Sequence, residues 1–305
     1  MNTPLPTTIE QYLEQIRAAL GAADPALIQD ALYDAEEHLR AERAEHPDET
    51  EAAVLARVAG SYGSPEEVAA IYLDTEVTVA RALRSPPPAP RKGAIARFFG
   101  VAADPRTYGA LFYMLLSLAT GIFYFTWVVT GLSLSAGLFI LIIGIPFLVL
   151  FLATVRVLSL VEGRIVETML GERMPRRPLY TERGLPWMER IKRLFTDART
   201  WSTMLYFGLM LPLGTVYFTI AVTGLTLTLS LIATPFAWLF GEHDGLRIDD
   251  WHFGPGVVDV SPGLALPLLF VLGVLGFFAM LHLARGVGRL HGAIAKQLLV
   301  KSATY

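Results

Sequence analysis

The chain contains 305 residues, of which 53% are hydrophobic and none is cysteine, so disulfides and thiolate metal sites are excluded. Residues 1–90 carry 16 acidic and 6 basic side chains, whereas the remaining residues carry 12 acidic and 19 basic ones. We therefore expect an acidic soluble head and a basic membrane-embedded body. The net charge of −10 on the head disfavours a nucleic-acid partner.

Residues 1–83 are predicted to form a small all-α bundle of four helices. Thr7 and Glu10 have the spacing of a capping box, and Asp24 precedes a proline that suits the first position of a helix. Asp48 and Ser64 mark the other two helix starts. Apolar residues follow at helical spacing: Ile9, Leu13, Ile16, Leu20, Leu27, Ala31, Ala35 and Leu39. The N-terminus lacks the basic and apolar regions of a signal peptide, so we expect a cytoplasmic head.

The charges of this head have two interpretations. Charged helical faces are most often solvated, but an acidic face can also bind a cytoplasmic regulatory protein. The segments YLEQIRAAL (12–20), DALYDAEEHLRAE (30–42) and VAGSYGSPEEVAAIYL (58–73) resemble the small helical domain family called HAAS. The resemblance covers residues 8–80 and implies signalling rather than catalysis.

Residues 84–93 form a linker with four prolines within five residues. Such a segment is extended and semi-rigid, so we expect a spacer between the head and the body.

The membrane body contains an internal repeat. Residues 104–134 and 197–227 share 15 of 31 positions without gaps, and each copy has enough apolar residues to span a bilayer. A second apolar segment, 137–156, aligns with 266–285 at a different offset. We therefore predict four transmembrane helices in two parallel repeats, 94–175 and 186–305. Each repeat should hold an interfacial elbow, a transmembrane hairpin and a trailing amphipathic helix.

The two offsets differ by 36 residues, which places an insertion at 228–263 of the second repeat. The first repeat is expected to turn directly at Gly131–Ser135. Cations cluster before the first span, between the hairpins and after the last span, whereas the insertion is acidic. This distribution predicts cytoplasmic termini, an extracytoplasmic insertion and contact with membrane lipids.

The body resembles the "Putative sensor" domain found ahead of bacterial histidine kinases, particularly in actinobacteria. The resemblance covers residues 95–300. Its residues are Arg106-Thr107, Tyr113, the Gly-x-x-Tyr-Phe-Thr of 121–126, the Thr-Gly-Leu-Ser-Leu of 130–134, and Gly144-Ile145-Pro146. It implies a sensor in a bacterial inner membrane. No kinase follows before Tyr305, so we expect output through the head or a separate protein.

Four tyrosines form the first candidate ligand site. Tyr113 and Tyr124 share a stripe on the first span, and Tyr206 and Tyr217 repeat it on the third. Such residues usually pack helices together, and the alternative is a seam for a lipid or small molecule. No Asp, Glu, Lys or Arg lies inside the predicted spans, away from their ends, which disfavours ion-coupled transport.

The insertion provides the second candidate site, with His243, Asp249, Asp250 and His252. These side chains could contact a sensed ligand, but their spacing matches no metal motif, so we predict no metal site. A solvated loop is the alternative. We expect His282 and His291 to lie at the membrane interface.

No catalytic motif is present, and we expect neither catalytic residues nor a cofactor. We interpret the chain as a non-enzymatic membrane sensor that signals through its head. The alternatives are a membrane-shaping scaffold and a transporter of an uncharged or lipidic solute. Homo-oligomerisation is left open.

Overall fold

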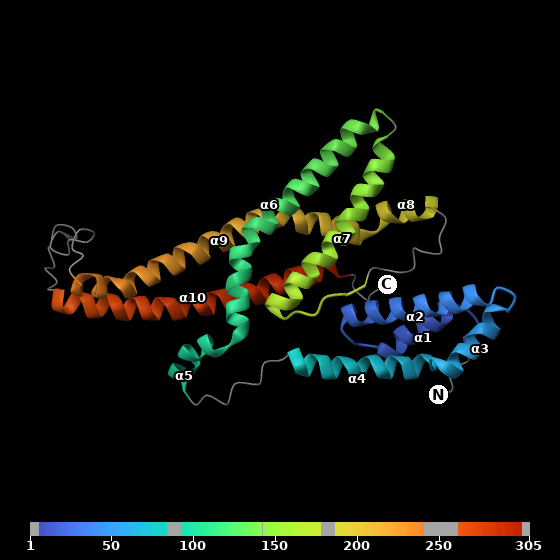
Figure 1. Ribbon diagram of the computed structural model, residues 1–305, viewed down its shortest axis with the longest axis horizontal. Coiled ribbons are helices and arrows are strands. Elements are labelled where there is room, and N and C mark those ends of the chain that lie inside the picture. Colours follow the sequence, from blue (N-terminus) through green and yellow to red (C-terminus); the bar gives the residue numbers. More distant parts are fainter. Residues whose placement is uncertain (1–5, 84–92, 142, 178–186, 241–261, 301–305) are drawn as a thin grey trace. The chain divides into compact units, whose positions relative to one another are not determined.

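The computed structural model describes residues 6–83, 93–141, 143–177, 187–240 and 262–300 (Figure 1). All regular elements within these ranges are helices, which confirms the all-α prediction. Four helices are long and apolar enough to cross a membrane: α6 (Pro105–Phe139), α7 (Gly144–Leu170), α9 (Ala198–Leu239) and α10 (Pro262–Leu299).

The chain divides into two compact units. The first comprises Met1–Pro87, Tyr124–Leu209 and His291–Tyr305, and the second comprises Pro88–Phe123 and Met210–Leu290. Helices α6, α9 and α10 therefore contribute to both units, and each unit is described by itself below.

The head, in the first unit, consists of α1 (Ile9–Leu20), α2 (Pro25–Glu45), α3 (Glu51–Ser61) and α4 (Pro65–Leu83) (Figure 1). Its core joins six of the eight predicted apolar positions of α1 and α2 to residues of α3 and α4, while Leu13 is only partly buried and Leu27 is not a member of this cluster. The buried members are Ile9, Tyr12, Ile16, Leu20, Ile28, Ala31, Ala35, Leu39, Val54, Leu55, Val58, Val68 and Ala69. Burial of this apolar surface holds the four helices together.

Two of the predicted helix caps are confirmed. The Asp24 carboxylate accepts from the N–H of Ala26 at 2.9 Å, and Ser64 and Glu67 form a reciprocal capping box. The other two were placed wrongly: Thr8 rather than Thr7 caps α1, and Thr50 rather than Asp48 caps α3. Neighbouring cap-forming residues compete at both starts, and the selected register buries Ile9 and Val54.

The long helices extend beyond the predicted spans. The predicted turn at Gly131–Ser135 is wrong, because α6 continues to Phe139. Gly131 instead serves packing: it has no Cβ atom, and the ring of Phe151 on α7 occupies that space. The beginning of the predicted insertion is likewise helical, as part of α9. The trailing amphipathic segments are continuous with α7 and α10.

Equivalent positions of the two hairpins make equivalent contacts. Gly131 faces Phe151 in the first unit, and Gly224 faces Met280 in the second. Arg156 pairs with Asp197 in the first unit, and Arg285 with Asp104 in the second. These contacts agree with the two-repeat interpretation, which stays a prediction.

Helices α6 and α9 approach closely within the second unit. The backbone at Gly121 faces the carbonyl of Met210, and Gly214 faces the carbonyl of Ser117, with no space for a Cβ atom at either glycine. Small residues permit this backbone contact, as is usual between membrane helices. Tyr217 packs beside the crossing with Met114 and Met280.

The predicted elbows are helices as well. They are α5 (Ala94–Phe99), followed by the short η1 (Gly100–Ala103), and α8 (Trp187–Thr196). In the second unit Phe98 packs against Phe278 and His282, while Ile95 and Arg97 are exposed. Exposed apolar and cationic groups on one short helix suit a membrane surface.

Candidate functional site

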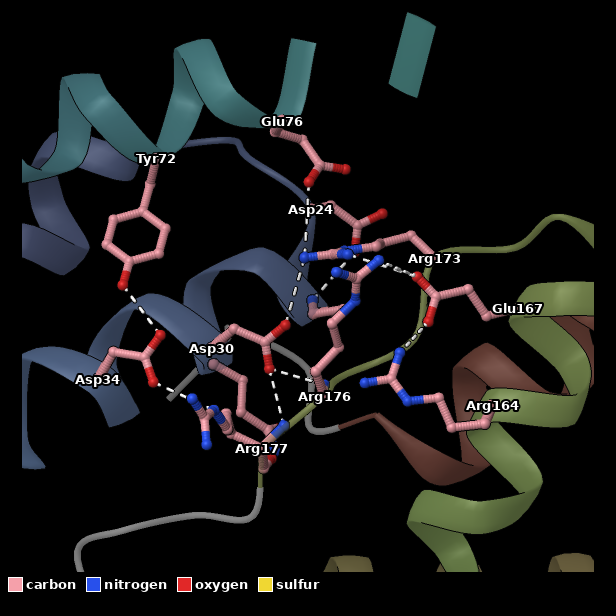
Figure 2. Close-up of polar contacts among 12 residues, drawn as sticks. Asp24, Asp30, Asp34, Tyr72, Glu76, Arg164, Glu167, Arg173, Arg176 and Arg177 are labelled. Atoms are coloured by element: carbon pink, nitrogen blue, oxygen red, sulfur yellow. Dashed lines mark hydrogen bonds and ion pairs between the residues drawn. The ribbon is translucent and has the colours of Figure 1, made fainter. Parts of the chain in front are cut away.

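The acidic face of the head contacts arginines of the same chain. One face of α2 is polar and carries Gln29, Asp30, Tyr33 and Asp34 at helical spacing. Another face of the same helix is apolar and packs in the head core. Their partners lie mainly in the segment after α7, residues 171–177, as Figure 2 shows. We call this set of interactions the docking contact.

Asp30 is at the centre of the docking contact. One carboxylate oxygen accepts from the backbone N–H groups of Arg176 and Arg177 at 2.7 and 2.9 Å, and the other lies 3.2 Å from Nη2 of Arg173 (Figure 2). The residue is only 6% exposed. Burial raises the pKa of Asp30, and the two N–H groups and Arg173 lower it in part. Desolvation therefore opposes a contact that the hydrogen bonds favour.

Acidic groups around Asp30 extend the contact. Asp34 lies 3.2 Å from Nε of Arg177 and accepts from the hydroxyl of Tyr72 on α4, while Glu76 lies 3.5 Å from Arg173. The hydrogen bond from Tyr72 holds the Asp34 carboxylate in place, and burial raises the pKa of that tyrosine. The docking contact thus depends on two head helices.

Two further pairs tie α2 to α9 and α10. The Gln29 amide accepts from Arg199 at 2.9 Å and donates to the carbonyl of Arg177 at 2.6 Å. Asp24 caps α2 with one oxygen and pairs with Lys296 through the other. The docking contact therefore involves α9 and α10 as well as the segment after α7.

The second feature of the site is a buried polar cluster formed by Tyr124, Glu162, Tyr206 and His291, from α6, α7, α9 and α10. Glu162 accepts from the hydroxyls of Tyr124 and Tyr206 at 3.0 and 2.8 Å. The Tyr206 oxygen lies 2.9 Å from Nε2 of His291, and because its proton goes to Glu162, this oxygen accepts from an Nε2–H group. Glu162, Tyr206 and His291 are each 0% exposed.

The predicted ligand residues have different outcomes. All four tyrosines are buried, and the structure brings Tyr124 and Tyr206 together on Glu162. Tyr217 belongs to the apolar cluster beside the α6–α9 crossing. His243, Asp249, Asp250 and His252 lie outside the described residues, so their role stays a prediction.

The sequence interpretation missed Glu162 and His291. It ended the second span at Arg156 and placed His291 at the interface, whereas both residues are fully buried on longer helices. When the second helices of the two repeats are aligned, Glu162 and His291 occupy the same position. This match is the sequence signal that could have identified both residues. A buried ionisable residue in a membrane helix is a functional candidate.

One group in the described ranges has metal-like spacing: Glu42, Glu45 and His46 on the head. Glu42 instead pairs with Arg57 at 2.9 Å, and Nδ1 of His46 lies 3.2 Å from the carbonyl of Glu42. Glu42 and His46 thus have protein partners, and we assign no ion to the group.

Comparison with known proteins identifies both parts of the chain. A family model described as "Putative sensor" matches residues 113–299, and the HAAS model matches residues 11–71. No curated protein and no solved structure matches the chain.

Proposed function

We propose, from the premise that this chain belongs to the Sensor family, that it is a non-enzymatic sensor whose membrane helices control the docking of its HAAS head. A membrane sensing and signalling role fits the two domains and the four apolar helices. The control of docking by the membrane helices is proposed from one observation: the Asp30 carboxylate lies between Arg173 and the N–H groups of Arg176 and Arg177.

The head and the connection after α7 lie on one side of the membrane, because a direct hydrogen bond cannot cross a bilayer. The cation-rich connection favours the cytoplasm, which supports cytoplasmic termini in a bacterial inner membrane. In this arrangement the stimulus would act on the spans or on the outer loop, and the output would leave through the head.

Helix α7 provides a route between the two features of the site. Its Glu162 connects to α6, α9 and α10 through the buried cluster. Five residues further along, Glu167 pairs with Arg173 and Arg176 at 3.4 and 3.0 Å. A displacement of α7 by a stimulus would therefore move the arginines that hold Asp30, and the costly burial of this carboxylate would favour release.

Release would expose the acidic face to a cytoplasmic regulatory protein. Asp30 and Asp34 are occupied by the chain's own arginines in the docked state, so docking and partner binding compete for the same carboxylates. A partner with a cationic surface fits this face.

The test separates release of the head from integrity of its acidic face. The triple variant R173Q/R176Q/R177Q removes the arginines and leaves the face intact, so it should capture more partner from native membranes than the wild type, as measured by quantitative mass spectrometry. Adding D30K should abolish the gain, because it reverses the charge at the centre of the face. Equal capture by both variants would contradict the proposed role of the face.

A further inference from the structure

The body side of the docking contact has the donors of an anion site. Two consecutive backbone N–H groups, of Arg176 and Arg177, point to one oxygen of Asp30, and the Arg173 guanidinium meets the other. Consecutive N–H groups and arginine forks are the donors with which proteins bind phosphate oxygens. In the docked state the Asp30 carboxylate is the resident anion.

The contacts that shape this segment belong to the body. The chain turns at Gly171, whose φ of 75° lies in the left-handed region, as the C-cap of α7. Met174 is completely buried, and its side chain packs over Gly163. Gly292 of α10 leaves room for the side chain of Glu172. None of these three contacts involves the head, so residues 171–174, which lead into the two N–H donors, stay attached to the body when the head leaves.

Three arginines also have a partner in the body that does not depend on the head. Glu167, with 7% of its side chain exposed, pairs with Arg164, Arg173 and Arg176. With Arg177, residues 164–177 carry four arginines against two carboxylates, those of Glu167 and Glu172. Removal of the head therefore leaves a positively charged site.

The position of the segment favours a membrane ligand. Counted from Gly144, a bilayer core takes about 20 of the 27 residues of α7, which leaves about 10 Å of helix before the chain turns at Gly171. This is the depth of lipid headgroups and of the surface potential of anionic lipids.

We propose that the Arg173–Arg177 segment binds the phosphate group of an anionic phospholipid when Asp30 leaves it. The inference rests on the proposed release of the head and names the ligand that replaces it. Lipid phosphate and Asp30 then exclude each other, so anionic lipid stabilises the released head.

The test measures lipid retention by the full chain in detergent supplied with equal amounts of phosphatidylglycerol and phosphatidylcholine, using native mass spectrometry. The D30K variant opens the site and should retain at least about fivefold more phosphatidylglycerol than the wild type, the effect of about one arginine at an anionic surface. D30K/R173Q/R177Q should return to the wild-type level. D30K/R289Q, which removes an exposed arginine of α10, should behave like D30K.

A soluble phosphate is tested in the same samples. Excess inorganic phosphate should leave the retained phosphatidylglycerol unchanged. Displacement of the lipid by inorganic phosphate, with no preference over phosphatidylcholine, would assign the site to a soluble anion and overturn the lipid proposal.

Spin labels at Ala41→Cys and Ala293→Cys report whether the head is released, since the natural chain has no cysteine. A released head with wild-type lipid retention in D30K would overturn the lipid site and leave the docking mechanism standing. A head that stays docked in D30K would overturn both.

Discussion

At the scale of single residues, Glu162 and Asp30 show how ionisable groups are placed in this protein. Glu162 is buried with two tyrosine hydroxyls as donors, and Asp30 is buried with two backbone N–H groups and an arginine. A buried carboxylate is tolerated only with such donors. The residues around each carboxylate therefore pack together through hydrogen bonds as well as through apolar contacts.

Substitution of Glu162 tests the buried cluster. Glu162→Ala removes the acceptor of the Tyr124 and Tyr206 hydroxyls and leaves a cavity, so we expect a loss of about 2 kcal/mol in the free energy of unfolding. Glu162→Gln keeps the volume and one acceptor oxygen, and should lose less than about 1 kcal/mol. Denaturant unfolding in detergent micelles measures both. Equal stability of the alanine variant and the wild type would show that the cluster does not hold the helices.

The residue scale also shows how far sequence reasoning reaches. Asp24 and Ser64 could be predicted as caps because the adjacent proline or glutamate leaves one register. The caps at Thr8 and Thr50 were missed because a residue one or two positions earlier is also able to cap, and only tertiary packing selects one. Glu162 was missed because its burial depends on three other helices that the local pattern does not describe.

At the scale of elements, glycines determine how closely the long helices approach. Gly121 and Gly214 permit backbone contact between α6 and α9, whereas Gly131 and Gly224 accommodate side chains from the second helix of each hairpin. The repeated sequence has both pairs at matching positions of its two copies. It predicted a turn at Gly131, however, because glycine signals both turns and close packing, and local sequence does not distinguish them.

Two glycines of α9 provide a matched test of the crossing. A Cβ at Gly214 would overlap the carbonyl of Ser117, so Gly214→Ala should cost about 1–3 kcal/mol of stability. A Cβ at Gly208 meets nothing within 4 Å, so Gly208→Ala should be neutral or slightly stabilising. Thermal unfolding in nanodiscs compares the two variants, and a Gly214→Ala protein as stable as Gly208→Ala would be incompatible with the crossing described.

At the scale of the whole molecule, the opposite charges of head and body define the docking contact. Composition alone indicated an acidic head and a basic connection between the hairpins. It could not indicate that Asp30 meets Arg173, Arg176 and Arg177, because these residues are more than 140 positions apart and any acid could pair with any base. The fold selects one pairing, because it brings one face of α2 against the segment after α7.

In the proposed mechanism, Asp30 holds the head on the membrane body. Double electron–electron resonance on the full chain in nanodiscs, with spin labels at Ala41→Cys on α2 and Ala293→Cys on α10, measures this directly. Both positions are exposed. We predict one narrow distance distribution for the otherwise wild-type chain and for D48K, which reverses an exposed head charge outside the contact. D30K should give a longer and broader distribution, and an unchanged distribution in D30K would contradict the account.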